Sequence, residues 1–288
     1  MTGREMKSNL TKFILKVLML CIITLSQSLN AFAWTVSPVR FELKGEKGKE
    51  YTLTFSVLNE SQLYQKRFEI QTDDWTINSK NDFLRKAFNK EVNNKYSATS
   101  WIKVTPQQFV VPPGETKNIR FTVRVPNELQ SNGEYSTGIF VGEKNIEKPI
   151  KGEKVVHIKQ DTFIGVIVYV KIGEEKHEVI LKDMKVSTKP TKEDLSRLTV
   201  IPIFECKGNI HSRAKLSVKL ESSSNPSEAK EFDAGELVVL RESEIQYPID
   251  IPEPLPKGTE WKLTVKADFE DEDSPVLVGT KKYKIPRN

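Results

Sequence analysis

Apolar and polar residues alternate at period two along much of this 288-residue chain. The clearest alternations run over Tyr51–Val57, Ile119–Val125, Leu216–Leu220 and Trp261–Phe269. This period places apolar side chains on one face of a strand and polar side chains on the other, as in an antiparallel sheet with one buried face. Turn residues such as Pro112-Pro113-Gly114 separate the segments at short intervals. Many short strands with this spacing predict an all-β chain built of β-sandwiches.

The longest stretch with strand character runs from Val155 to Ile172. From Phe163 onward it is β-branched and aromatic almost throughout, which suits a packed, pleated surface. Its first part differs, because Val156 and Ile158 alternate with polar residues. We expect this first part to be an edge segment that extends past the body of its sheet. The strand is then either the ordinary last strand of a sandwich or an edge with which a partner pairs.

The segment 78–100 interrupts the strand pattern. It is polar and rich in lysine and asparagine, and its apolar residues predict a short amphipathic turn of helix near Phe83 to Phe88. We interpret the segment as a long insertion between strands. Such an insertion either carries part of the function or is a surface loop without a role.

Residues 1–33 have the organisation of a secretory signal peptide. Basic residues precede or enter an apolar run, Phe13–Leu25, which is too short to span a membrane comfortably. The small-x-small pattern Ala31-Phe32-Ala33 follows this run. We therefore expect cleavage before Trp34 and export from the cytoplasm.

The mature length predicts two domains, one at 34–173 with the insertion and one at 177–288. Alternating strand patterns lie on both sides of the boundary expected near Gly173 to Lys176. The mature chain keeps a single cysteine, Cys206, so no disulfide can form within it. Its place in the strand-like run VIPIFEC predicts a buried, unreactive thiol.

Charge and motifs argue for binding rather than catalysis. The formal net charge is +5, and cations and anions are interspersed, which is not typical of a nucleic-acid partner. No second hydrophobic span follows the leader, so we expect no stable membrane insertion. The three histidines lack a metal-ligand spacing, and no phosphate loop or nucleophile motif is present. We expect no enzyme and neither a cofactor nor a metal.

Arg40 is the most notable polar residue of the first mature strand, which we expect to run from Trp34 to Leu43. Apolar residues flank it in WTVSPVRFEL, so its guanidinium is suited to clamp a carboxylate in two parallel hydrogen bonds. The alternative is a surface arginine that pairs with Glu42 or with a neighbouring strand.

The order of features from Val36 to Ile172 resembles the first domain of the PapD-like periplasmic pilus-assembly chaperones. The resemblance rests on SPVRFEL in the opening strand, VLNES, the pair Asp74-Trp75, WIKVTPQQFVVPPGETKNIRFTVRVP and GEYSTGIFVGE. It implies two immunoglobulin-like β-sandwich domains in tandem after the cleaved leader, set in an L shape. Members of the family add their last first-domain strand to the open edge of a pilus subunit, and a basic pair in the cleft binds the terminal carboxylate of that subunit.

The resemblance assigns roles residue by residue. Arg40 matches the arginine of the opening strand, and Val156 and Ile158 match the apolar alternation that enters the groove of the subunit. The second basic residue falls at Gly165, which has no side chain, and Lys159 and Lys171 are the alternatives for it. This departure marks a divergent member, with Arg40, Val156 and Ile158 as the expected partner-binding residues.

The implied function is a periplasmic chaperone that binds and stabilises a secreted or fimbrial subunit by β-strand addition. A structural or adhesive envelope protein built from the same immunoglobulin-like domains is the alternative. A third possibility is a carbohydrate-binding sandwich in which Trp75, Trp101 or Tyr96 provides a stacking platform.

Overall fold

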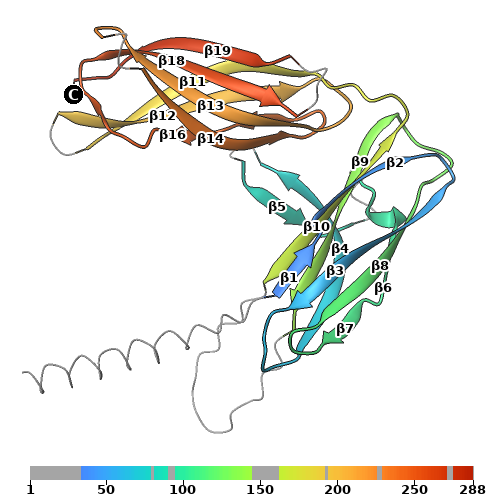
Figure 1. Ribbon diagram of the computed structural model, residues 1–288. Coiled ribbons are helices and arrows are strands. Elements are labelled where there is room, and N and C mark those ends of the chain that lie inside the picture. Colours follow the sequence, from blue (N-terminus) through green and yellow to red (C-terminus); the bar gives the residue numbers. More distant parts are fainter. Residues whose placement is uncertain are drawn as a thin grey trace, which may run out of the picture.

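The computed structural model describes residues 34–78, 81–89, 95–144, 162–191, 194–225, 229–270 and 275–287. Nearly all regular structure is β, and it forms two β-sandwiches, one after the other along the chain (Figure 1). The predicted all-β fold with two immunoglobulin-like sandwiches is therefore confirmed. The expected signal peptide, residues 1–33, lies outside the described residues.

The first sandwich packs two sheets against each other. The strands of one sheet lie in the order β1 (Trp34–Ser37), β3 (Glu50–Asn59), β8 (Thr116–Arg124) and β6 (Ile102–Thr105). The other has the order β2 (Arg40–Gly45), β10 (Phe163–Ile172), β9 (Gly133–Glu143), β4 (Lys66–Ile77) and β5 (Phe83–Lys86), and β7 (Gln108–Val111) also pairs with β4. Fully buried apolar side chains from both sheets, including Phe55, Phe121, Ile139 and Val168, form the core. A short 3₁₀ helix spans Thr99–Trp101.

The opening segment is two strands, so the prediction of one strand from Trp34 to Leu43 is wrong. Strand β1 pairs with β3 in one sheet, and β2 pairs with β10 in the other. Pro38 lies between them and has no amide proton with which to continue a ladder. The chain therefore crosses from one sheet to the other at this residue, and Arg40 becomes the first residue of β2.

Strand β10 pairs with β9 along its whole length but with β2 along only part of it. The parallel pairing with β2 begins at Ile167, opposite Arg40, and continues to Ile172. Alternate residues such as Val166 and Val168 are buried in the core. The residues between them, such as Ile167 and Tyr169, face outward. The predicted edge segment before Phe163 lies almost entirely outside the described residues.

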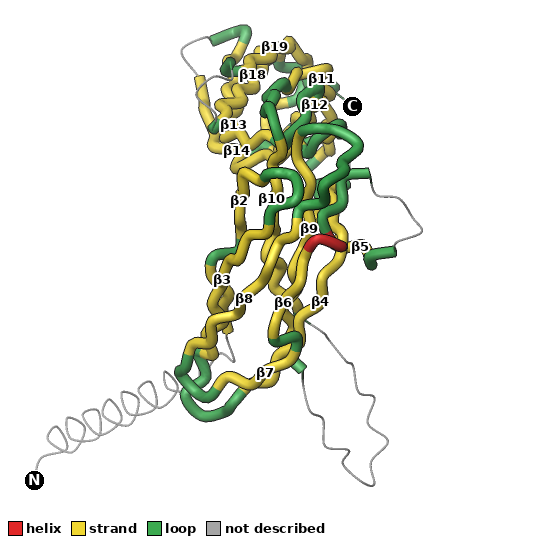
Figure 2. The backbone as a smooth tube through the Cα atoms, turned by 90° about the vertical axis from the view of Figure 1, so that its right-hand side faces the viewer, coloured by secondary structure: helices red, strands yellow, loops and turns green. Residues whose placement is uncertain are grey.

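The insertion does not form the predicted turn of helix. Its residues Phe83–Lys86 are β5, which pairs antiparallel with the end of β4. The ring of Phe83 stacks on that of Trp75 at 5.4 Å, a contact provided by the neighbouring strand and not by the local sequence. The β4–β5 hairpin lies on the side of the first sandwich that faces the second, inside the angle between them (Figure 1). In the view of Figure 2, the second sandwich lies above the first.

The second sandwich also has two sheets. One contains β11 (Val179–Pro190) and β12 (Leu195–Cys206), with β15 (Glu244–Gln246), β16 (Ile249–Asp250) and β17 (Leu255–Pro256) paired to β12. The other has the order β14 (Ala229–Val239), β13 (Ser212–Ser222), β18 (Glu260–Phe269) and β19 (Leu277–Lys284). Cys206 is buried as predicted. Among the described residues, no helix has the length and apolar character needed to cross a membrane.

Candidate functional site: a strand edge beside the domain junction

The first half of β10 presents a backbone edge for which the described residues supply no partner strand. The amide of Ile167 donates to the carbonyl of Val39 at 2.9 Å, so the backbone groups of Ile167 point toward the β2 side. Backbone groups alternate in direction along a strand, so those of Phe163 and Gly165 point to the same side. The described pairing on that side starts only at Ile167. This open edge, Phe163–Val166, is therefore able to accept another strand.

The outer face of the sheet is flat beside this edge because glycines leave room for aromatic rings. A Cβ atom at Gly138 would lie 2.5 Å from the Phe140 ring, and one at Gly165 would lie 3.1 Å from it. The Phe140 ring is thus laid across the positions where two side chains would otherwise stand. The face beside the edge therefore carries aromatic rings, with the Arg85 guanidinium over those of Phe140 and Phe163.

Arg40 lies at the end of the open edge. It faces outward opposite Ile167, and its side chain keeps 43% of its exposure. Its Nε atom is 3.6 Å from Oε1 of Glu42, which is the surface pairing considered as the alternative to carboxylate binding. An exposed pair of this kind is weak, so it leaves the guanidinium available to a better-placed carboxylate.

The second basic position is not filled by either of the expected lysines among the described residues. Lys171 lies six residues beyond Gly165, roughly 20 Å along the strand. Its ammonium binds Glu42 at 3.0 Å and Glu175 at 3.4 Å. A different cation, Arg85 of β5, lies over this part of the face, 4.6 Å from the Phe163 ring centroid. Lys159 lies outside the described residues, as do the predicted contact residues Val156 and Ile158.

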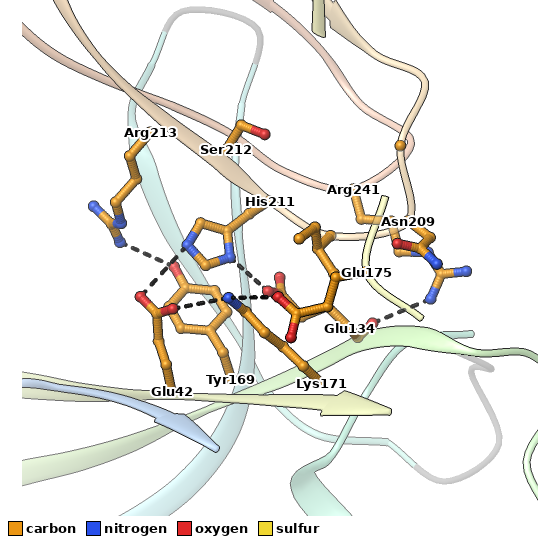
Figure 3. A network of polar contacts seen from close by, with 12 residues as sticks. Glu42, Glu134, Tyr169, Lys171, Glu175, Asn209, His211, Ser212, Arg213 and Arg241 are labelled. Carbon is orange, nitrogen blue, oxygen red and sulfur yellow. Dashed lines mark hydrogen bonds and ion pairs between the residues drawn. The ribbon is translucent and has the colours of Figure 1, made fainter. Parts of the chain in front are cut away.

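A buried polar network joins the two sandwiches next to the site (Figure 3). Nδ1 of His211, which directly precedes β13 in the second sandwich, is 2.5 Å from Oε2 of Glu134 on β9. Both side chains are only 4% exposed. The imidazole also stacks on the Tyr169 ring at 4.0 Å, and the Tyr169 hydroxyl accepts a hydrogen bond from Arg213 at 3.2 Å. Burial raises the pKa of Tyr169, so this hydroxyl stays neutral in the physiological range.

Backbone contacts reinforce this junction. The amide of Glu134 donates to the carbonyl of Asn209 at 2.9 Å. A Cβ atom at Gly133 would lie 2.4 Å from the same carbonyl, and φ at this glycine is +112°, a conformation that side chains disfavour. On the far side of the contact, Arg241 stacks on Tyr96 at 3.7 Å and donates to Ser131. The two sandwiches are therefore joined by tightly fitted groups from both.

The Glu42–Lys171 ion pair links β2 to β10 at this junction. Partial burial by itself would raise the pKa of Glu42, but its hydrogen bond and charge attraction to Lys171 outweigh burial and leave that pKa below its ordinary value. Burial likewise opposes the charged form of Lys171, and Glu42 and Glu175 more than compensate, so the pKa of the lysine is raised. Both groups are charged near neutral pH, and Lys171 has a structural role here.

The proposed carbohydrate platform is contradicted for its tryptophans. Trp75 and Trp101 are both buried, because Trp75 is covered by Phe83 and Tyr169 and Trp101 packs on Tyr135. The Tyr96 ring is covered by the Arg241 guanidinium and meets the Tyr135 ring edge to face. No exposed ring of the three is left as a flat sugar-binding surface.

Sequence reasoning missed Arg85, Glu134 and His211. Glu134 and His211 are 77 positions apart and carry no local motif. Phe83 and Arg85 do stand at period two, and that spacing was the available signal for a strand in the insertion.

No protein-family model matches the sequence, and no curated protein matches it. Solved structures of fimbrial chaperones are similar to it. A chaperone–tip adhesin complex of CFA/I fimbriae biogenesis aligns with a TM-score of 0.43 and 14% identity, over 88% of this chain and 99% of that chain. The YadV chaperone aligns with a TM-score of 0.43 and 10% identity, over 87% and 99%. The CsuC–CsuE chaperone–tip adhesion subunit complex of Acinetobacter baumannii aligns with a TM-score of 0.42 and 12% identity, over 88% and 99%. Because these TM-scores lie below 0.5, we base the proposals below on the topology and residues of this chain itself.

Proposed function

We propose that this chain is a periplasmic chaperone that holds a secreted, pilin-like subunit by β-strand addition at the open edge of β10. The observation that carries the proposal is the incomplete pairing of β10. Its backbone faces a described partner strand from Ile167 onward and none over Phe163–Val166. A strand added at this edge gains main-chain hydrogen bonds from Phe163 and Gly165, and alternate side chains supply specificity.

The position of Arg40 supports a directional mode of binding. Arg40 terminates the open edge on the outer face, so a subunit strand that runs along Phe163–Val166 ends beside this guanidinium. A C-terminal carboxylate at that point forms a charge-assisted hydrogen bond, and a bidentate geometry adds specificity. The expected contacts of Val156 and Ile158 belong to the same proposal, since both residues lie just before β10 in the chain.

The network at the junction supports the same function by fixing the second sandwich relative to the edge. Glu134 is on β9 and Tyr169 on β10, the two strands that carry the site, and both contact His211. A rigid surface loses little conformational entropy when a partner binds. The chaperone accordingly presents a preformed edge.

Substitution of Arg40 by alanine tests the anchor. We expect Arg40→Ala to weaken capture of the secreted partner by about tenfold or more, because a charge-assisted hydrogen bond contributes roughly 1.5–3 kcal/mol. The thermal midpoint should stay near that of the wild type, since an exposed ion pair adds little stability. Affinity-tagged protein incubated with a periplasmic extract, followed by quantitative mass spectrometry of what is retained, measures capture. Arg120→Ala, another exposed arginine on the opposite sheet, is the matched control and should capture normally. Equal capture by all three proteins contradicts the anchor.

A further inference from the structure

We infer that the β4–β5 hairpin is a second contact surface for the same secreted subunit, an apolar platform that touches its body while its strand pairs with β10. This inference rests on the proposed function. It concerns the segment that the sequence analysis interprets as an insertion. Strand addition at β10 with Arg40 as the anchor does not use this segment. The surface consists of Phe83 and Leu84 at the start of β5, with Arg85 behind them.

Two consecutive residues at the start of β5 carry large, exposed apolar side chains. Phe83 is 49% exposed and Leu84 is 41% exposed, although both belong to a regular strand. Adjacent strand residues point to opposite sides, so the hairpin is apolar on both of its faces at this point. Single exposed apolar residues are common, but a paired exposure on an ordered element next to a binding edge marks an interaction surface.

The hairpin is held firmly against the sheet that carries the open edge. Arg85 donates from Nε to Oδ2 of Asp73 at 2.6 Å, and its Nη2 group contacts Gln71 and Asp73. The guanidinium also lies 4.5 Å from the Phe140 ring and 4.6 Å from the Phe163 ring. Phe163 is the first residue of β10. The hairpin and the open edge are thus parts of one continuous surface.

Geometry favours the subunit as the occupant of this platform. Strands in a sheet are about 4.8 Å apart, so the hairpin at β4 and an added strand beside β10 are separated by roughly 15 Å. A small domain is about 30 Å across. Arg40 faces outward, on the same side of the sheet as Phe140 and the hairpin. A subunit of this size that is anchored by Arg40 on this side reaches the hairpin, with Phe83 on the face toward it and Leu84 on the opposite face of the same strand.

The second sandwich already contacts the hairpin directly beside Phe83, because Ile77 is the residue paired with Phe83. Ile77, at the end of β4, packs against the core of the second sandwich, and Leu240 packs near Trp75. Phe83 and Leu84 remain exposed beside these contacts. The hairpin that carries them lies inside the angle between the sandwiches (Figure 1).

The test measures how three variants bind one probe. Phe83→Ser and Leu84→Ser change the hairpin, and Gly165→Pro changes the open edge of β10. The probe is the secreted protein that the wild-type chain retains from periplasmic extract, identified by mass spectrometry and purified. We expect Phe83→Ser and Leu84→Ser each to weaken its binding about tenfold. Leu63→Ser is the matched control, because Leu63 is 65% exposed in the loop before the far end of β4. It should bind as the wild type does.

Each outcome decides whether the hairpin platform alone is overturned or the proposed strand addition is overturned with it. If Gly165→Pro loses the probe while both hairpin variants bind as the wild type does, the platform is overturned and the proposed function stands. If Gly165→Pro binds normally, or if nothing is retained by the wild type, both are overturned. Should Phe83→Ser melt early because it loses its stacking on Trp75, Leu84→Ser decides. A benzophenone attached at Leu84→Cys must also crosslink to the probe, and the buried Cys206 leaves the new thiol as the reactive one.

Discussion

Replacing Gly165 by proline is expected to abolish capture of the secreted partner while the protein still folds. Proline has no amide proton, and the amide of Gly165 points to the open side of β10. The ladder with β9 does not use that amide, so the native pairing is kept. Proline is tolerated at such outward-facing positions of edge strands. We expect a change of within about 1 kcal/mol in the free energy of unfolding and a loss of about tenfold or more in affinity.

Gly165→Ala is the matched control for this variant. Its methyl group meets the Phe140 ring at about the same place, where a Cβ atom lies 3.1 Å from the ring, but its amide still donates. Affinity should therefore stay near the wild-type value for alanine and be lost for proline. Equal losses in the two variants would attribute the effect to the ring contact, and equal retention would show that the edge is not used. Thermal melting of both proteins separates either result from misfolding.

Substituting His211 by alanine is expected to cost about 3–5 kcal/mol of the free energy of unfolding. The change leaves the Glu134 carboxylate buried at the junction without its closest partner, and removing one member of a buried pair carries a cost of this size. The stacking on Tyr169 is lost as well. Chemical denaturation followed by fluorescence measures the loss.

A double-mutant cycle isolates the contribution of this pair. In Glu134→Ala/His211→Ala the buried carboxylate is gone, so the double variant should be more stable than the sum of the single losses predicts. Strict additivity of the two losses, or a cost below about 1 kcal/mol for His211→Ala, would contradict the assigned role. The His211→Ala variant should also capture the partner less well, because the second sandwich is then held less firmly against the first.

The fold was predictable from local sequence wherever one face of a strand is buried. Period-two alternation correctly located β3, β8, β13 and β18, whose alternating apolar residues enter one of the two cores. It failed at Pro38, where the missing amide moves the chain to the other sheet, and at Phe83–Lys86, where pairing with β4 decides the structure.

The site was less predictable because its parts come from distant segments. Arg40 could be singled out as a cation in an apolar strand, and the structure places it at the end of the open edge. Nothing local indicates that His211 meets Glu134 or that Arg85 reaches Phe163, because each contact depends on how separate strands pack. The role of Val156 and Ile158 stays a prediction, since both lie outside the described residues.

Hydrogen exchange of the open edge tests the central claim most directly. The amides of Phe163 and Gly165 should exchange quickly in the free protein and be strongly protected once the partner is bound, because strand addition gives each a main-chain acceptor. A peptide from β8, which pairs with β3 along its whole length in the free protein, should be protected equally in both states. Protection confined to Phe163–Val166 and the residues just before them is the predicted result. Unchanged exchange at this edge in the purified complex would contradict binding by strand addition.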